Sequence, residues 1–186
     1  MARLRFETVR DLFEAFPVAS DELMVEPTDA PCLDFVKSLL DQDEGAKAAG
    51  VCAYLLPRRE AVWWACRSVR TLNPERSNEE NQCLMSAEEW VKEPEEDHRL
   101  AALEIGNQTS HKLPASWLAR AAGFAGGSMP FGEGISVPVA IDQTARAVRF
   151  AVLSAVARVA PNARSDLLRG CVEDGIKIAS DESRGA

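Results

Sequence analysis

The stretch IDQTARAVRFAVLSAVARVAP, residues 141–161, has the pattern of a helix buried at the centre of a protein. Apolar side chains fall on nearly all sides of the helix that it would form, so no broad polar face is left for water. Asp142 stands where a helix-capping residue is expected. A helix without a polar face needs other helices around it. The stretch therefore predicts a helical core that the rest of the chain encloses.

Most segments outside this stretch show the narrower apolar face of surface helices. FETVRDLFEAF, residues 6–16, has apolar residues at spacings of three and four, and Pro17 is expected to end it. The prolines and small polar residues of 18–31 predict a loop. Further helices are expected within residues 32–42, 43–57, 58–72, 73–93, 94–106, 113–125 and 162–180.

These segments together predict an all-α, single-domain bundle of about seven to nine helices. The length of 186 residues suits one domain, and 46% hydrophobic with 27% charged residues is an ordinary globular composition. We place the domain at residues 1–180 and expect a flexible tail at 181–186. The run of helix pairs also allows a helical-repeat-like superhelix, although no convincing internal repeat is found.

The Gly- and Pro-rich segment GGSMPFGEGISVPVA, residues 126–140, interrupts the helical patterns. Loops of this length are uncommon in compact domains unless they have a role. It lacks the form of a phosphate-binding loop, since it has no lysine and follows a helix instead of a strand. We interpret it as a connector or a loop that contacts a partner.

Motifs for catalysis and metal binding are missing from the sequence. His98 and His111 are the only histidines, and HExxH, CxxC and GxSxG do not occur. We therefore predict no catalytic, cofactor-binding or metal-binding residues and a non-enzymatic role. The five cysteines lie far apart, mostly among apolar neighbours, which predicts buried, reduced thiols.

The charge of the chain is concentrated in one acidic segment. The formal net charge is -8, and residues 75–104 alone hold ten acidic and three basic residues. Nucleic acid is therefore not an expected partner. No stretch approaches the roughly 18 to 20 apolar residues of a membrane span, and acids near the N-terminus do not suit a signal peptide. We expect a cytoplasmic protein without membrane insertion.

The stretch LPRREAVWWACRSVRTL, residues 56–72, places two tryptophans side by side in an arginine-rich helix. Trp63 lies one turn from both Arg59 and Arg67, so both guanidinium groups are expected to flank its indole. Trp64 is turned by about 100° and is expected to fill a groove against the preceding helix. Trp63 is either packed at the border of the core or part of a surface anchor with Arg59, Arg67 and Arg70.

The same stretch carries a resemblance to a known family. LPRREAVWWACRSVR, AEEWVKEPEEDHRLAALE, GGS and TARAVRFAVLSAVARV follow one another between about residues 45 and 180. In order and spacing they resemble a bacterial family classed as a domain of unknown function, with LPxREAVWWAC as its signature. The family's loop after GGS is richer in proline than the loop in this chain. The resemblance implies proteobacterial genes that can accompany type VI secretion loci, and it brings no activity, cofactor or catalytic residue.

Three functions remain open from the sequence. The first is a non-enzymatic cytoplasmic adaptor or accessory protein that binds a protein partner, in type VI secretion. The second is an anion-binding protein or enzyme with a pocket beside the Gly-rich loop, lined by Trp63, Arg59 and Arg70. The third is an immunity-type protein whose acidic face blocks a basic toxin, although a merely solvated helix surface explains the same acids. The oligomeric state is left open. The candidate acidic residues are Glu88, Glu89, Glu93, Glu95 and Glu96.

Overall fold

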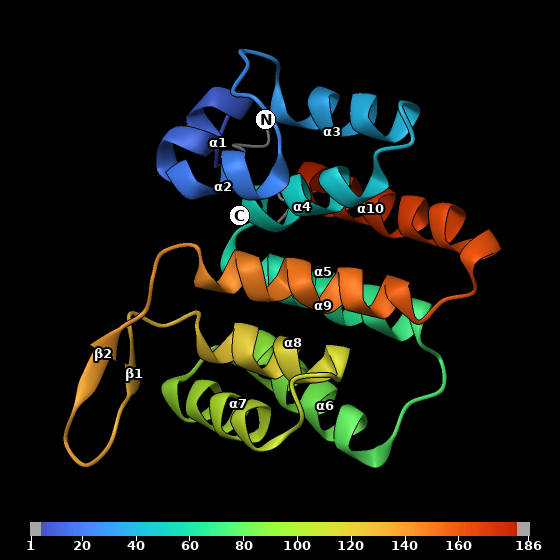
Figure 1. The fold of residues 1–186 in the computed structure, drawn as a ribbon. Coiled ribbons are helices and arrows are strands. Elements are labelled where there is room, and N and C mark those ends of the chain that lie inside the picture. Colours follow the sequence, from blue (N-terminus) through green and yellow to red (C-terminus); the bar gives the residue numbers. More distant parts are fainter. Residues whose placement is uncertain (1–4, 182–186) are drawn as a thin grey trace.

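Ten α-helices and one short hairpin make up most of the described chain (Figure 1). The computed structural model describes residues 5–181. The helices are α1 Val9–Ala15, α2 Pro17–Leu23, α3 Cys32–Asp41, α4 Gly45–Leu55, α5 Arg58–Leu72, α6 Asn78–Lys92, α7 Glu96–Gln108, α8 Pro114–Gly123, α9 Gln143–Ala157 and α10 Arg164–Asp181, with a short 3₁₀ helix at Pro161–Ala163. The strands are β1 Ser128–Pro130 and β2 Ser136–Pro138.

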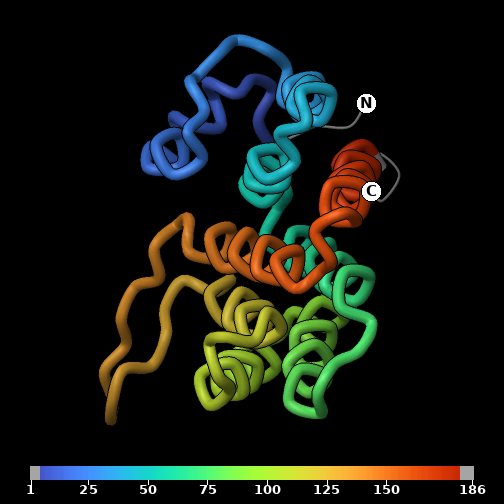
Figure 2. The backbone as a smooth tube through the Cα atoms, turned by 45° about the vertical axis from the view of Figure 1, so that its right-hand side comes forward, coloured from blue at the N-terminus to red at the C-terminus, as the bar shows by residue number. Residues whose placement is uncertain are grey.

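The prediction of a mainly helical fold is confirmed, but a purely all-α class is wrong. The Gly-rich segment forms an antiparallel hairpin in which Met129 pairs with Val137, and it extends away from the helices (Figure 2). Gly132 and Gly134 adopt positive φ angles of 75° and 70°, which let the chain reverse between the strands. The described residues also contain ten α-helices, more than the seven to nine expected.

The segment after α1 differs from its predicted loop. Pro17 does not simply end a helix, because it occupies the first turn of α2, where its missing N–H costs no hydrogen bond. Met24, in the left-handed conformation with φ 52°, then ends α2. The remaining loop is therefore shorter than expected. At the other end of the chain, Asp181 still belongs to α10, and the rest of the expected tail, residues 182–186, lies outside the described residues.

The predicted central helix is α9. It contacts α4, α5, α8 and α10, and Figure 1 shows it between the α6, α7 and α8 layer on one side and the α3, α4 and α10 layer on the other. Val148 and Val152 in the middle of α9 have no exposed surface. Buried apolar residues from all ten helices join in one cluster around it.

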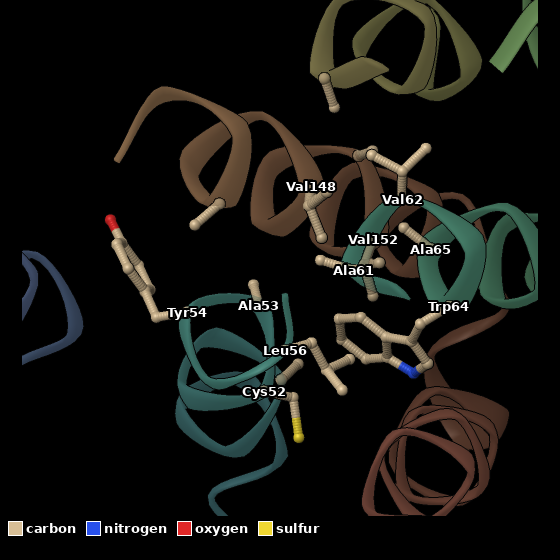
Figure 3. Close-up of a cluster of buried hydrophobic side chains, with 14 of the residues drawn as sticks. Cys52, Ala53, Tyr54, Leu56, Ala61, Val62, Trp64, Ala65, Val148 and Val152 are labelled. Atoms are coloured by element: carbon tan, nitrogen blue, oxygen red, sulfur yellow. The ribbon is translucent and has the colours of Figure 1, made fainter. Parts of the chain in front are cut away.

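Trp64 is the largest fully buried side chain in the described chain. Its indole lies among Cys52 and Leu56 on one side and α10 on the other (Figure 3). The indole Nε1–H donates to the carbonyl of Cys171 at 2.7 Å, so the ring's polar atom is satisfied inside the core. The predicted burial is correct. The groove is formed by α10 as well as by the preceding helix, which the local spacing did not indicate.

Candidate interaction surface

Trp63 lies at the surface of α5, with 40% of its surface exposed. The Arg67 guanidinium carbon lies 5.4 Å from the centre of the Trp63 ring, a cation–π distance. Arg59 does not stack on the other side. Its guanidinium instead donates to the carbonyls of Val91 at 2.6 Å and Lys92 at 3.2 Å, at the C-terminal end of α6. One of the two predicted arginine contacts is therefore present.

A groove of about 330 Å³ runs beside Trp63 where α5 meets the end of α6. Arg59 of α5 donates hydrogen bonds to the last carbonyls of α6, so these bonds connect the two helices that form the walls of the groove. We call this region the Trp63 groove. It is lined by Arg59, Glu60, Trp63, Val91 and Lys92.

Arg70 takes part in a different contact. It donates from two nitrogens to the Glu88 carboxylate at 2.7 and 2.8 Å, an ion pair with two parallel hydrogen bonds that joins α5 to α6. The hydrogen bond to Glu88 raises the pKa of Arg70. Arg70 does not line the Trp63 groove. The expected anion pocket of Trp63, Arg59 and Arg70 is therefore not assembled as one cavity.

The acidic candidates divide into paired and unpaired residues. Glu96 accepts two hydrogen bonds from Arg99 at 2.6 and 2.7 Å, and these bonds lower the pKa of Glu96. Glu93 has one weak neighbour, the His98 ring nitrogen at 4.0 Å. Glu89 and Glu95 are exposed and form no ion pair with any described residue.

A second groove, of about 300 Å³, lies between α5 and α10 on the other side of Arg67. Arg67 lies 3.5 Å from the carboxylate of Asp174, with both side chains partly exposed. Arg67 therefore stands between the two grooves, with Trp63 on one side and Asp174 on the other. The sequence pattern missed Asp174, because only the tertiary packing of α10 brings it to α5.

Other kinds of site are not visible in the described chain. Residues 5–181 contain no cluster of three His, Cys, Asp or Glu side chains suited to hold a metal ion. In the same range, no helix combines the length and the apolar character that a membrane span requires. All five cysteines are buried as free thiols, which confirms that part of the prediction.

A family model matches most of the chain. No curated protein and no solved structure matches the chain. The sequence model of DUF6931, described as a family of unknown function, matches residues 35–179. This range begins within α3 and runs into α10, so it includes both tryptophans of α5, the acidic segment and the hairpin. The chain therefore belongs to the DUF6931 family of unknown function.

Proposed function

We propose that this protein is a non-enzymatic accessory or adaptor protein that binds a protein partner at the Trp63 groove. The observation that carries the proposal is the 40% exposed indole of Trp63, held in place by Arg67 beside a groove. Tryptophan and arginine are the residues most often found as interface hot spots. A side chain that is already fixed loses little further entropy on binding, which favours affinity.

The setting that we propose is the cytoplasm, with type VI secretion as the process served. This part rests on the resemblance of the α5 signature to a family whose genes can accompany such loci. The partner would then be a component of the secretion machine. It would need an apolar side chain for the Trp63 groove and an acidic group able to reach Arg67.

A photo-cross-linking experiment tests the proposal directly. p-Benzoyl-phenylalanine replaces Lys92, an exposed residue that lines the groove, so that Trp63 is kept, and the covalent products formed in the native host are identified by mass spectrometry. Met85, which is 56% exposed on α6 and does not line the groove, takes the same probe as the matched control. We expect a secretion component to be cross-linked from position 92 and not from position 85. Equal products from both positions would contradict the proposal.

The acidic face supports a second candidate, an immunity-type protein. Glu89, Glu93 and Glu95 are exposed, and no described arginine or lysine neutralises them. They are thus available to a basic toxin, whereas Glu88 and Glu96 already bind Arg70 and Arg99. Steered association of this kind weakens as salt rises.

Charge reversal separates this candidate from a solvated surface. Changing Glu89, Glu93 and Glu95 together to lysine should abolish protection against a basic toxin while the free energy of unfolding stays nearly unchanged. The control changes three exposed acids at the other end of the molecule to lysine, which gives the same change in net charge. If the variant with lysine at positions 89, 93 and 95 still protects against the basic toxin, the proposed immunity function is wrong. The control residues are Glu7, Glu14 and Glu26.

A further inference from the structure

A small cavity with mainly apolar walls and three polar side chains lies at the N-terminal end of α9, away from the Trp63 groove. Its volume is about 10 Å³, which is room for one atom or group of the size of a water molecule. Four of its apolar or aromatic walls, Ala53, Tyr54, Leu56 and Ala61, appear in Figure 3. The other lining residues are Arg5, Phe16, Arg58, Ile141, Thr144 and Ala145.

Thr144 supplies an unsatisfied hydrogen-bond donor to this cavity. It is only 2% exposed, and its Oγ1 has no hydrogen-bond partner in the described part of the protein. A buried hydroxyl without a partner costs free energy, and a bound water molecule or ion is one way in which that cost is offset. Thr144 and Ala145 also belong to the first turn of α9. The N–H groups of a helix's first turn have no acceptor within the helix and carry partial positive charge.

Two arginines, Arg5 and Arg58, line the same cavity. Arg5 is exposed over much of its surface, and its pKa is lowered by the burial of the rest of the side chain and by the positive charge of Arg58. The contacts of Arg5 with described residues are to the rings of Phe6 and Phe16, at 5.0 and 5.3 Å. Arg58 donates to the carbonyls of Ala125 at 3.0 Å and Ile141 at 3.3 Å. Two cations therefore share a cavity, and neither forms an ion pair with a described carboxylate.

Two acidic residues close to Tyr54 and to the start of α9 do not supply the missing negative charge. Arg146 lies 2.7 Å from the carboxylate of Glu22 and 3.8 Å from that of Asp142, so both are already paired. Glu22 also accepts a hydrogen bond from the Tyr54 hydroxyl at 3.1 Å. Neither Glu22 nor Asp142 lines the cavity.

We propose that this cavity binds a small anion between Arg5, Arg58 and the Thr144 hydroxyl, at the N-terminus of α9. The volume admits one anionic atom, either a halide ion or a single oxygen of a carboxylate or phosphate. Arg58 ties this site to the hairpin, because Ala125 and Ile141 stand just before and just after the segment that carries it. An occupied site thus holds both ends of the hairpin segment against α5. The proposal does not depend on the Trp63 groove.

The test measures the thermal midpoint during titrations with sodium chloride, acetate and phosphate at constant ionic strength. Hexafluorophosphate balances the ionic strength, because this anion is larger than a halide ion and has no oxygen to place in the cavity. We expect a saturable rise in the midpoint with at least one of the three anions. Chloride alone would identify a halide site, whereas acetate or phosphate would identify an oxyanion site. An equal response to all salts, hexafluorophosphate included, or no saturation, would overturn the proposal.

Variants locate the binding. Arg5→Gln should weaken the apparent affinity about tenfold or more, since it removes a charge-assisted contact. Arg10→Gln, which loses the same charge from an exposed pair with Asp29, should bind like the parent. Thr144→Val keeps the side-chain shape and is expected to fold, because the hydroxyl that it removes has no described partner. It should also weaken binding, and parental affinity in both Arg5→Gln and Thr144→Val would refute the site.

A structural readout completes the experiment. If chloride is the anion that raises the midpoint, crystals grown in sodium bromide should show an anomalous peak between Arg5 and Thr144 in the parent protein. The peak should be missing in Arg5→Gln. For such a halide site, bromide found only at the exposed surface of the parent protein would contradict the proposal.

Discussion

Gly106 of α7 lies so close to α8 that a Cβ atom at this position would be 2.9 Å from the backbone nitrogen of Arg120. The relationship is reciprocal, because a Cβ on Gly123 of α8 would lie 2.5 Å from the Cβ of Leu103 on α7. Real Cβ atoms do not come this close to other atoms. The two helices therefore cross with their backbones nearly in contact, and both glycines are needed for that crossing.

Gly106→Ala should destabilise the protein by about 1 to 3 kcal/mol, the usual cost of overpacking. In an open helix the same change stabilises by up to about 1 kcal/mol, so the expected sign is the opposite of helix propensity. Gly170→Ala in α10 is the control, because nothing lies within 4 Å of a Cβ there. Urea unfolding of both variants measures the difference. Stabilisation by both changes would show that α7 and α8 are farther apart than described.

The sequence predicted those features that local spacing determines. The apolar pattern of residues 141–161 predicted the central helix, which is α9. The turn of about 100° between adjacent helical residues predicted that Trp63 and Trp64 differ in burial, and they do, at 40% and 0% exposed. The acidic helix was also placed correctly, with Leu84 and Ala87 inside.

Features that depend on distant contacts were not predicted. The hairpin rests on two strands of three residues each, too short for an alternating pattern to stand out among prolines and glycines. The proline at position 17 is compatible with both the end and the start of a helix, and only the structure distinguishes them. The sequence pattern singled out Arg59 and Arg70 and not Arg58. The partners of Arg58 are the carbonyls of Ala125 and Ile141, which lie far from it in the sequence, so the pattern around Arg58 does not indicate them.

The cysteines should be unreactive in the folded protein. All five are buried, and burial raises the pKa of the Cys32 thiol to about 11 and that of Cys52 to about 12. The thiolate is the reactive form, so almost none is present at pH 8. Ellman's reagent should therefore modify no thiol rapidly in buffer and all five in guanidinium chloride. A thiol that reacts within seconds in the native protein would contradict this burial.

Acid should weaken the protein through Glu80, which is 2% exposed. Burial by itself raises the pKa of Glu80, but hydrogen bonds from Arg158 and from the Ser77 backbone outweigh it and hold the pKa below the ordinary 4.5. Because the folded pKa is the lower one, the stabilisation is fully present above the unfolded pKa. It is lost as the pH falls through the folded pKa.

The free energy of unfolding should therefore fall as the pH drops below about 4.5, the ordinary pKa of a glutamate. Glu80→Gln should be less stable at pH 7, since it loses the charged partner of Arg158, and its stability should change less over the same range. Chemical denaturation at a series of pH values measures both effects. Parallel curves for the parent and Glu80→Gln would show that Glu80 does not contribute to the acid sensitivity.

The adjacent tryptophans give the sharpest comparison, because they share a helix and differ only in the side that they face. Trp64→Ala should cost about 3 to 5 kcal/mol, the range for emptying a large buried site. Trp63→Ala should cost no more than about 1 kcal/mol, since it loses mainly an exposed contact with Arg67. Trp64→Phe should fall between them, because the ring still fills the core while the Cys171 carbonyl loses its donor.

Urea denaturation with a shared m-value measures the three variants on one scale. The order also bears on function, because a residue used for binding should be removable without unfolding the protein. If Trp63→Ala keeps its stability and no longer co-purifies with the partner that cross-linking identifies, the loss belongs to the interface. If Trp63→Ala is as unstable as Trp64→Ala, the indole of Trp63 stabilises the core instead. The proposal that the Trp63 groove binds a partner would then have no support from this residue.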